Sequence, residues 1–416
     1  MSRPARHIDL VRLLLIGPFG LYPKSTTRAR VLPLARALAE RGHQVTVLIP
    51  PYDHPADAGR RDRIWGVDVI HTPLPGRGAV FARSPLVYLS VAWAAVAATA
   101  RLLSAQADLV HVFKPKGVAG ACFYVALLRR VVSRQERLVL DTDDWEGEGG
   151  WNELDRLPWW ARALVSFQED SIIRLAPAVT AASRFLWHRC AAIRRSAAHL
   201  CYVPNGYDPR DYPGQHAADG RAIRQQYRLG EAPVVLLYTR FFEFQLPRIV
   251  CLWERVHRAV PEARLLVVGG GMFGQERILA RLLDAAGLSQ SARFTGWLQP
   301  AQIPSHLAAA DVAWFPYDDA LANRAKCSAK LIELMAQRCA IVAEAVGQNP
   351  EYIEHGVSGM LVQPGDVDAF AAMTIDLLRD PGARQRLGEA ARAMLQERFC
   401  WSRLGAEVEA LYRDIC

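Results

Sequence analysis

Paired cysteines and metal-binding clusters are missing from this sequence. Its eight cysteines are scattered over 416 residues, none of them in C-x-x-C spacing and none grouped with histidine. Disulfide frameworks and structural zinc sites both depend on such spacing, so neither is expected here. The cysteine pattern favours a protein of the reducing cytosol.

Long uncharged hydrophobic runs are missing as well. The stretch at 85–103 has sixteen uncharged residues before Arg101, fewer than the roughly 20 that a membrane-spanning helix needs. We expect a buried or partly membrane-facing helix there. The first 20 residues imitate a signal peptide, but Arg12 interrupts the apolar run and no small-residue cleavage site follows. A buried first strand is therefore the better interpretation.

Disorder and low complexity are also absent from the composition. Hydrophobic residues make up 51% of the chain and charged residues 22%, which are values of a globular protein. A length of 416 residues is too great for one core, so at least two domains are expected. The net charge of +8 suits an anionic partner, but nucleotide diphosphates, phospholipid surfaces and nucleic acids all qualify, so the sign of the charge does not decide among them.

Buried strands alternate with helical stretches along the chain. A strand at 11–16 leads through a loop of glycines and hydroxyl groups into a helix at 30–40 and a second strand at 44–50. The other strands expected in the first half lie at 67–70, 108–113, 138–141, 178–181 and 200–203. None of the connections carries a hairpin signal, so the alternation predicts an α/β fold with a parallel, doubly wound sheet.

The chain changes character after the VPNGYD motif at 203–208. Polar residues follow the motif, and a new strand begins at 233–239. We place a domain boundary near residue 210, which gives a domain at 1–210, a second at 211–395 and a C-terminal amphipathic helix at 396–416.

A helix, a buried strand and a glycine-punctuated loop follow one another at 329–366. Three apolar residues of the helix face inward, which leaves Lys330 and Glu333 near its start. Helix N-termini prefer anions, so a lysine there indicates an anionic ligand bound by Lys330 and the free amides. Glu333 can accept hydrogen bonds from the two hydroxyls of a ribose. Phosphate and ribose together suggest a nucleotide.

The same segment resembles the donor-site motif of family 4 of the retaining glycosyltransferases, which have the GT-B fold of the glycogen-phosphorylase-like superfamily. The resemblance rests on K-L-x-E-x-M-A, a Gly-x-x-E loop and G-x-L-V-x-P-G-D, and it places Glu333 and Glu351 at the family's donor positions. It implies two Rossmann-like domains that face each other across a cleft, with the last helix packing back on the first domain.

The resemblance assigns further donor contacts to the second half. Arg240, directly after the strand at 233–239, matches an arginine that grips the donor diphosphate in the family. The family's lysine is missing from its usual place, and Arg248 is the nearest cation, with Lys330 able to compensate. Gly269 and Gly271 belong to a G-x-G-x-x-G run that we interpret as a turn for a nucleotide sugar, because the acidic residue of a dinucleotide site is absent. The backbone around Leu298 would hold the nucleobase.

Acceptor contacts are expected at the strand ends of the first domain. Gly20, Lys24 and Thr26 lie in the first loop, where the basic residues fit phosphate contact or a solvated basic face equally well. His111 and Asn205 follow two other strands.

Asp143 and Asp144 lie at the end of the strand at 138–141. Asp143 stands about where the family has a histidine near the donor sugar. Either aspartate could orient the acceptor hydroxyl or receive its proton, and a helix N-cap in an acidic loop is the alternative. A divalent-cation motif fits the surrounding sequence poorly. Four nearby tryptophans could stack on a sugar, lie at a lipid interface or belong to the core: Trp145, Trp151, Trp159 and Trp160.

The resemblance implies an enzyme: a hexosyltransferase that uses a nucleotide-diphosphate sugar and retains anomeric configuration. Its acceptor would be a hydroxyl of a glycan or lipid-linked saccharide in polysaccharide biosynthesis of the cell envelope. We expect no metal or cofactor, no nucleic-acid partner, and a cytoplasmic location with peripheral membrane contact. Ala325 replaces a glutamate of the family that contacts the sugar. A GT-B sugar-nucleotide epimerase and a catalytically degenerate nucleotide-sugar-binding protein therefore stay open as alternatives.

Overall fold

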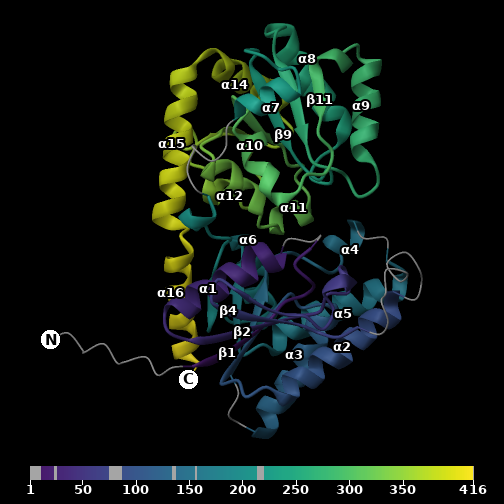
Figure 1. Cartoon of the computed structure of the whole chain (residues 1–416), viewed down its shortest axis with the longest axis vertical. Helices are drawn as coiled ribbons and strands as arrows, with labels where there is room; N and C mark the ends of the chain where they lie inside the picture. Colours follow the sequence, from purple (N-terminus) through teal and green to yellow (C-terminus); the bar gives the residue numbers. More distant parts are fainter. Residues whose placement is uncertain are drawn as a thin grey trace, which may run out of the picture. The chain divides into compact units, whose positions relative to one another are not determined.

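The strand expected near the N-terminus forms as β1 (Arg12–Ile16), which lies in the middle of a sheet. This computed structural model describes residues 11–22, 26–74, 87–133, 137–154, 157–212 and 220–415. The chain divides into two compact units. Unit 1 comprises Met1–Asn205 and Trp401–Cys416, and unit 2 comprises Gly206–Cys400 (Figure 1).

Unit 1 is built on an eight-stranded sheet with the order β3-β4-β2-β1-β5-β6-β7-β8 among the described residues. Apart from β3, each strand pairs with its neighbours in parallel. The remaining strands are β2 (Gln44–Ile49), β3 (Arg61–Ile64), β4 (Val67–His71), β5 (Leu109–Phe113), β6 (Arg137–Thr142), β7 (Ala178–Ala181) and β8 (Leu200–Tyr202). The carboxyl ends of parallel strands share one edge, so the loops after β1, β5, β6 and β8 meet there.

The expectation of a purely parallel sheet without hairpins is wrong at one edge. Strand β3 pairs with β4 in antiparallel register, and Trp65 and Gly66 form the two-residue turn between them. Both residues have positive φ, 52° and 81°, as two-residue hairpin turns require. Tryptophan rarely takes this conformation, so the sequence W-G gave no recognisable turn signal.

Two layers of helices cover the sheet of unit 1. Alternate residues of β1 point to opposite faces, with Leu13 and Leu15 packing on one side and Leu14 and Ile16 on the other. The first face is covered by α1 (Leu32–Glu40) and α16 (Trp401–Asp414), and the second by α2 (Val87–Ser104), α3 (Gly117–Ser133), α5 (Trp159–Leu175) and α6 (Arg184–Arg194). Shorter elements are η1 (Thr27–Val31), η2 (Pro55–Asp57) and α4 (Trp151–Leu154).

Unit 2 has a second, entirely parallel sheet with the order β11-β10-β9-β12-β13-β14. The strands are β9 (Val234–Tyr238), β10 (Arg264–Val268), β11 (Ala292–Phe294), β12 (Val312–Phe315), β13 (Ala340–Glu344) and β14 (Met360–Val362). The helices are α7 (Gly220–Gln226), α8 (Leu246–Ala259), α9 (Gln275–Ala285), α10 (Ile303–Leu307), α11 (Leu321–Ala325), α12 (Ala329–Ala336), α13 (Asn349–Tyr352), α14 (Val367–Arg379) and α15 (Pro381–Arg398), with short turns η3 (Pro209–Asp211), η5 (Ser289–Ser291) and η6 (Pro300–Gln302). One apolar core lies on each face of this sheet.

The end of the chain returns to unit 1 (Figure 1). Helix α15 packs in unit 2, whereas α16 buries Leu404 and Val408 in the core that also contains α1. Gly405 allows a close approach, because a Cβ at this position would lie 2.9 Å from Cβ of Ala37. Among the described residues, none of the helices combines the length and hydrophobicity that crossing a membrane requires.

Candidate functional site

The helix that carries Lys330 forms as α12, and its N-terminus is the centre of the candidate site. The helix begins at Ala329, and the side chain of the N-cap residue Ser328 makes no capping hydrogen bond. Leu331 and Leu334 are buried, so their packing in the core holds the helix in position. The first-turn amides and the Lys330 side chain are therefore held in a defined place.

One buried carboxylate gathers two lysines beside this helix end. Oε1 of Glu243 accepts hydrogen bonds from Nζ of Lys326 at 2.8 Å and from Nζ of Lys330 at 2.9 Å. The turn after β9 holds Glu243 in place, because Oγ1 of Thr239 and the amide of Phe242 donate to its other oxygen. Burial disfavours the charged carboxylate, but the two lysines outweigh it and hold the pKa of Glu243 well below its usual range.

Arg240 adds a third cation to this group. The pKa of Lys330 is lowered to about 8, mainly by burial, with the positive charges of Lys326 and Arg240 adding to the effect. Within the described residues, the buried Nε of Arg240 makes no hydrogen bond, and its guanidinium lies over the ring of Trp297 at 5.6 Å. Two lysines thus share one carboxylate, and the charge of Arg240 acts on Lys330, so positive charges outnumber negative ones in this group, which suits an anion.

Aromatic rings form the wall around the two lysines. Nζ of Lys326 lies 4.1 Å from the ring centroid of Phe242 and 5.4 Å from that of Tyr317. The Lys330 ammonium lies 5.9 Å from the rings of both Tyr238 and Phe242. Such rings exclude water and hold the cations by their negative faces, which strengthens the attraction to an anion.

The glycine loops after β10 and β11 lie next to each other. The amide of Gly269 donates to the carbonyl of Gly296 at 3.2 Å. Gly269 has φ of 121°, and a Cβ there would lie 2.0 Å from the carbonyl oxygen of Thr239, so packing against β9 requires glycine. Gly271 donates its amide to Glu276. Leu298 packs against the core; a nucleobase contact through its backbone stays a prediction.

The two glutamates predicted for the donor lie on two helices of unit 2. Glu333 follows Lys330 by almost one turn of α12, and Glu351 lies on α13. The loop before α13 packs tightly against the end of α11, because a Cβ on Gly347 would lie 2.6 Å from the carbonyl oxygens of Asn323 and Arg324. Ala325, which takes the place of the family's first glutamate, is fully buried.

Arg248 is held by a different set of partners. Its guanidinium forms ion pairs with Asp318 at 2.7 Å and with Glu344. Glu344 also accepts hydrogen bonds from the amides of Tyr317 and Gly365. The positive charge of Arg248 is therefore balanced within the protein, which does not favour the predicted diphosphate contact.

Lys114 is enclosed by the acidic loop of unit 1. Its ammonium lies 3.0 Å from Asp143, 2.6 Å from Asp144 and 2.7 Å from Glu146. These three carboxylates are close enough together to hold a metal ion, with ligand atoms within 4.8 Å of one another. The lysine occupies the place that a cation would take. The three negative charges outweigh burial and hold the pKa of Lys114 well above its usual value.

Burial changes the proton affinity of the two predicted catalytic aspartates. It raises the pKa of both Asp143 and Asp144, and neighbouring carboxylates add to this effect while Lys114 opposes it. Asp143 is 7% exposed. A buried carboxyl with a raised pKa at the end of a strand is a candidate for proton transfer.

His111 does not fit the predicted acceptor contact. The side chain is completely buried; Nδ1 lies 2.7 Å from the hydroxyl of Tyr412, and Nε2 lies 3.1 Å from Oγ1 of Thr180. Burial lowers its pKa to about 3, with a smaller contribution from the charge of Arg30. Both ring nitrogens are thus engaged inside unit 1, and His111 joins β5 to α16.

The remaining acceptor-side residues lie at the same edge of the sheet. The amide of Gly20 donates to Asp53 at 2.9 Å, which ties the loop after β1 to the loop after β2. Oδ1 of Asn205 accepts a hydrogen bond from Arg30 at 3.3 Å. Thr26 precedes η1, and Lys24 lies outside the described residues. Acceptor contacts of Gly20, Thr26 and Asn205 stay predictions.

Two sequence families match the chain, one in each unit. The family described as "Glycosyl transferase 4-like domain" matches residues 25–206, and "Glycosyl transferases group 1" matches residues 232–380. A GDP-mannose-dependent alpha-(1-6)-phosphatidylinositol monomannoside mannosyltransferase of Mycolicibacterium smegmatis is 30% identical over 301 residues, covering 70% of this chain and 74% of that protein. The chain belongs to glycosyltransferase family 4.

Further comparisons agree with this family. A mannosyltransferase of the same description from Mycobacterium tuberculosis is 26% identical over 91% of this chain and 92% of its own length. The catalytic domain of starch synthase IV from Arabidopsis thaliana has a TM-score of 0.74 at 14% identity, covering 98% of this chain and 99% of that one. This family 4 protein therefore has the GT-B fold and is a glycosyltransferase enzyme.

Two residues of the cation group in this glycosyltransferase were missed at the level of sequence. Lys326 lies in the loop NRAKCSAKL, which resembles a lysine-containing loop of some members of the family, but no role for Lys326 itself was predicted from the sequence. Glu243 follows Arg240 within a run of aromatic residues. A lone carboxylate among buried aromatics needs a cationic partner, which was the available signal.

Proposed function

We propose that the three cations of unit 2 bind the diphosphate of a nucleotide-sugar donor and stabilise it as the sugar leaves. The observation that carries this proposal is the pairing of Lys326 and Lys330 with the single carboxylate of Glu243 at the start of α12, with the charge of Arg240 acting on Lys330. The diphosphate gains charge as the glycosidic bond breaks, and fixed cations in a water-poor site lower the energy of that state. In this proposal Lys326, and not Arg248, is the second cation that contacts the diphosphate.

Glu333 supplies the second part of the proposed donor site. It lies on the same helix as Lys330, and its carboxylate can accept hydrogen bonds from both hydroxyls of a ribose. Glu351 and the backbone of Gly269, Gly271 and Leu298 are the further donor contacts. The donor is proposed to be a nucleotide-diphosphate hexose, and the names of the two mycobacterial relatives make GDP-mannose the first one to test.

The acceptor is proposed to be a hydroxyl of a lipid-linked saccharide or glycan of the cell envelope. This part is supported by the two relatives, whose names describe transfer to a phosphatidylinositol mannoside. Asp143 and Asp144 are the proposed acceptor-side carboxylates, since burial raises the pKa of each. Transfer would proceed with retention and without a metal, at the cytoplasmic side of a membrane with peripheral attachment.

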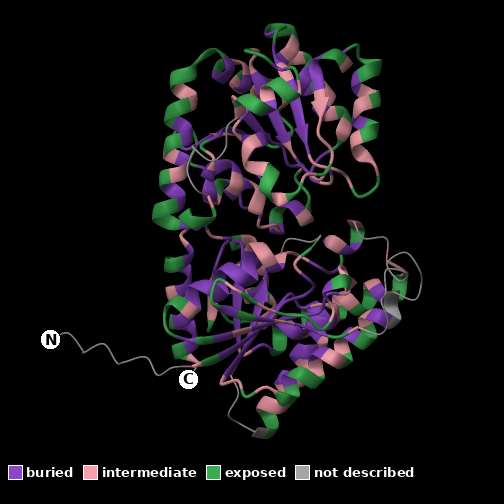
Figure 2. Ribbon diagram, in the orientation of Figure 1, coloured by how far each residue is buried: buried purple, intermediate pink, exposed green. Residues whose placement is uncertain are grey.

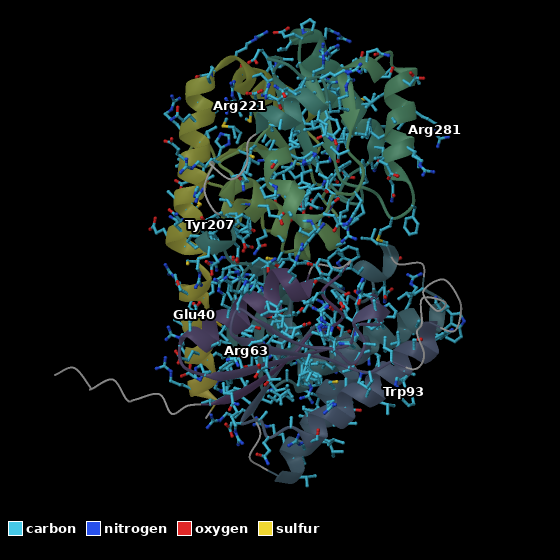
Figure 3. All side chains as sticks on the ribbon, viewed as in Figure 1. Glu40, Arg63, Trp93, Tyr207, Arg221 and Arg281 are labelled. Atoms are coloured by element: carbon cyan, nitrogen blue, oxygen red, sulfur yellow. The ribbon has the colours of Figure 1, made fainter. Side chains whose placement is uncertain are left out.

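Calorimetry with GDP, GMP and GDP-mannose tests the diphosphate site. We expect Lys330→Ala to weaken GDP binding at least about tenfold, since one close charge–phosphate contact contributes roughly 1.5–3 kcal/mol, and to affect GMP less. Arg281→Ala is the matched control, because this arginine points outward from α9 (Figure 3) and should bind GDP like the parent. Equal GDP affinity of parent and Lys330→Ala would contradict the assignment.

A donor panel of UDP- and GDP-sugars tests the reaction itself. Release of nucleoside diphosphate with formation of a glycosylated lipid is the expected result, and Glu333→Ala should lower it through weaker donor binding. An isomerised donor would indicate the epimerase alternative. Binding without turnover of any donor would leave only a sugar-nucleotide-binding protein.

A further inference from the structure

Exposed aromatic and aliphatic side chains gather on three helices of unit 1. Trp159 is 81% exposed, Val132 77% and Phe167 65%, although residues of these types are normally buried. The residues that define this surface, called the apolar face below, lie on α2, α3 and α5: Trp93, Leu128, Val132, Trp159, Trp160 and Phe167.

These side chains form stripes at helical spacing. On α5, Trp160, Leu164 and Phe167 follow one another at i, i+4 and i+7, and all three are exposed. On α2, Trp93 and Val96 begin a similar stripe. The opposite sides of α2 and α3 are also apolar and buried against the sheet, so these two helices are hydrophobic nearly all round, whereas α5 also buries Gln168 and Glu169. Such helices are normally covered on every side, which indicates a missing partner.

The three helices lie side by side on one face of the sheet (Figure 1). Their buried sides share a single core that includes Ala98 of α2, Phe123 of α3 and Ile172 of α5. The hydroxyls of Tyr124 and Ser171 form a hydrogen bond of 2.6 Å that joins α3 to α5. Figures 2 and 3 show exposed positions on the outer side of this layer and Trp93 pointing away from it. The stripes therefore lie on the outer side of one layer of helices.

The charged residues of α2 and α3 are all basic. Helices α2 and α3 contain no aspartate or glutamate, and their charged residues are Arg101, Arg129 and Arg130. On α5, the two acidic residues Glu169 and Asp170 both pair with Arg189. An apolar surface with tryptophans and a basic rim matches the two layers of an anionic bilayer surface, its acyl boundary and its phosphates.

We propose that the apolar face docks unit 1 on an anionic lipid bilayer. Trp159, Trp160 and Phe167 enter the headgroup region from the outer side of α5, and Arg101 and Arg130 lie against lipid phosphates. This inference deepens the proposed membrane location of the enzyme by naming the surface that carries it. Vesicle binding is measured without donor or acceptor, so failure of this proposal leaves the proposed transfer reaction untouched.

Co-sedimentation of the full chain with vesicles tests the apolar face. The parent should bind vesicles of phosphatidylcholine mixed with phosphatidylglycerol and bind pure phosphatidylcholine much less. The triple variant Trp159→Ser/Trp160→Ser/Phe167→Ser should lose at least about tenfold in partitioning, since each aromatic side chain buries a large apolar area. Trp65→Ser is the matched control, because Trp65 is an exposed tryptophan of the same unit in the β3–β4 turn.

A charge variant separates the basic rim from the apolar contacts. Arg101→Glu/Arg130→Glu should weaken binding to the anionic vesicles and leave the small binding to pure phosphatidylcholine unchanged. The proposal is overturned if the parent does not bind anionic vesicles, or if the triple variant binds them like Trp65→Ser. It is also overturned if light scattering shows that the parent is an oligomer and the triple variant a monomer, since a second copy of the chain would then cover this face.

Discussion

At the scale of single residues, Lys330 makes donor binding depend on pH. Its pKa of about 8 in the folded protein means that the ammonium loses its proton as the pH rises through 8. We expect GDP affinity to fall between pH 7 and pH 9, because a neutral amine attracts the diphosphate less. Calorimetry across this range measures the effect, and Lys330→Arg is the control, since an arginine keeps its charge and should give a flat profile.

The lowered pKa of Lys330 also makes the stability of the fold depend on pH. The pKa of Lys330 is lower in the folded than in the unfolded chain, so between about pH 8 and its ordinary value of 10.5 the unfolded state binds more protons. The contribution of Lys330 to the free energy of unfolding therefore rises with pH in that window and is constant below it. Bound diphosphate should raise the pKa of Lys330 again, because it favours the charged ammonium.

Lys114 acts as a fixed cation in unit 1, and its removal should create a metal site. In Lys114→Met the carboxylates of Asp143, Asp144 and Glu146 would repel one another, so the melting temperature should fall. Added Mn²⁺ should restore stability in this variant only, since a divalent cation needs such oxygen ligands. Lys116→Met is the matched control, because it removes a second lysine that pairs with Glu146. A parent that Mn²⁺ stabilises equally would contradict this role of Lys114.

At the scale of elements, most strands and the helix α12 could be predicted from the sequence because their signals are local. The strand expected at 138–141 forms as β6 (Arg137–Thr142), and the strand expected at 178–181 forms as β7 with the same bounds. The β3–β4 hairpin was missed, since its turn relies on a tryptophan at positive φ. Helical residues expected from Arg30 begin instead with the π-helical turn η1 (Thr27–Val31). A π-helical turn is rare, and hydrophobic periodicity does not distinguish it from an α-helix.

Residues of the candidate site could be predicted only where their role follows from their own type and position in the sequence. Lys330 and Arg240 were found because each stands at the end of a regular element, and the structure couples their charges. Glu243 and Lys326 were missed because their role comes from a contact between residues 83 positions apart. His111 looked like a ligand contact at a strand end, but the C-terminal helix, 301 positions away in sequence, supplies Tyr412 as its partner.

The contact between α1 and α16 gives a prediction at the same scale. Gly405 faces Ala37 so closely that Gly405→Val must push the helices apart, which should cost about 1–3 kcal/mol in the free energy of unfolding. Arg403→Ala on the exposed side of α16 is the control, with an expected change within about 0.5 kcal/mol. Urea unfolding measures both variants. An unchanged midpoint for Gly405→Val would mean that α16 does not hold this close contact.

At the scale of the whole molecule, the path of the chain decides which part can fold alone. Unit 2 (Gly206–Cys400) is continuous in sequence and has its own sheet with a core on each face. Unit 1 is discontinuous: α16 buries Trp401, Leu404 and Val408 against it, and Glu409 accepts a hydrogen bond from Arg41 at 2.7 Å. Residues 1–205 without this helix would expose to water the hydrophobic side of α1 that α16 covers.

We therefore expect residues 206–400 alone to unfold cooperatively and to bind GDP within a few-fold of the full chain, since Arg240, Lys326, Lys330 and Glu333 all lie in this piece. Residues 1–205 alone should lack a cooperative transition, and joining 401–416 to them through a flexible linker should restore it. Thermal unfolding followed by near-ultraviolet circular dichroism, together with calorimetry, measures each piece. If residues 1–205 fold fully without α16, the helix is not part of the core of unit 1. If 206–400 folds without binding GDP while the full chain binds it, the nucleotide requires contacts from unit 1 as well.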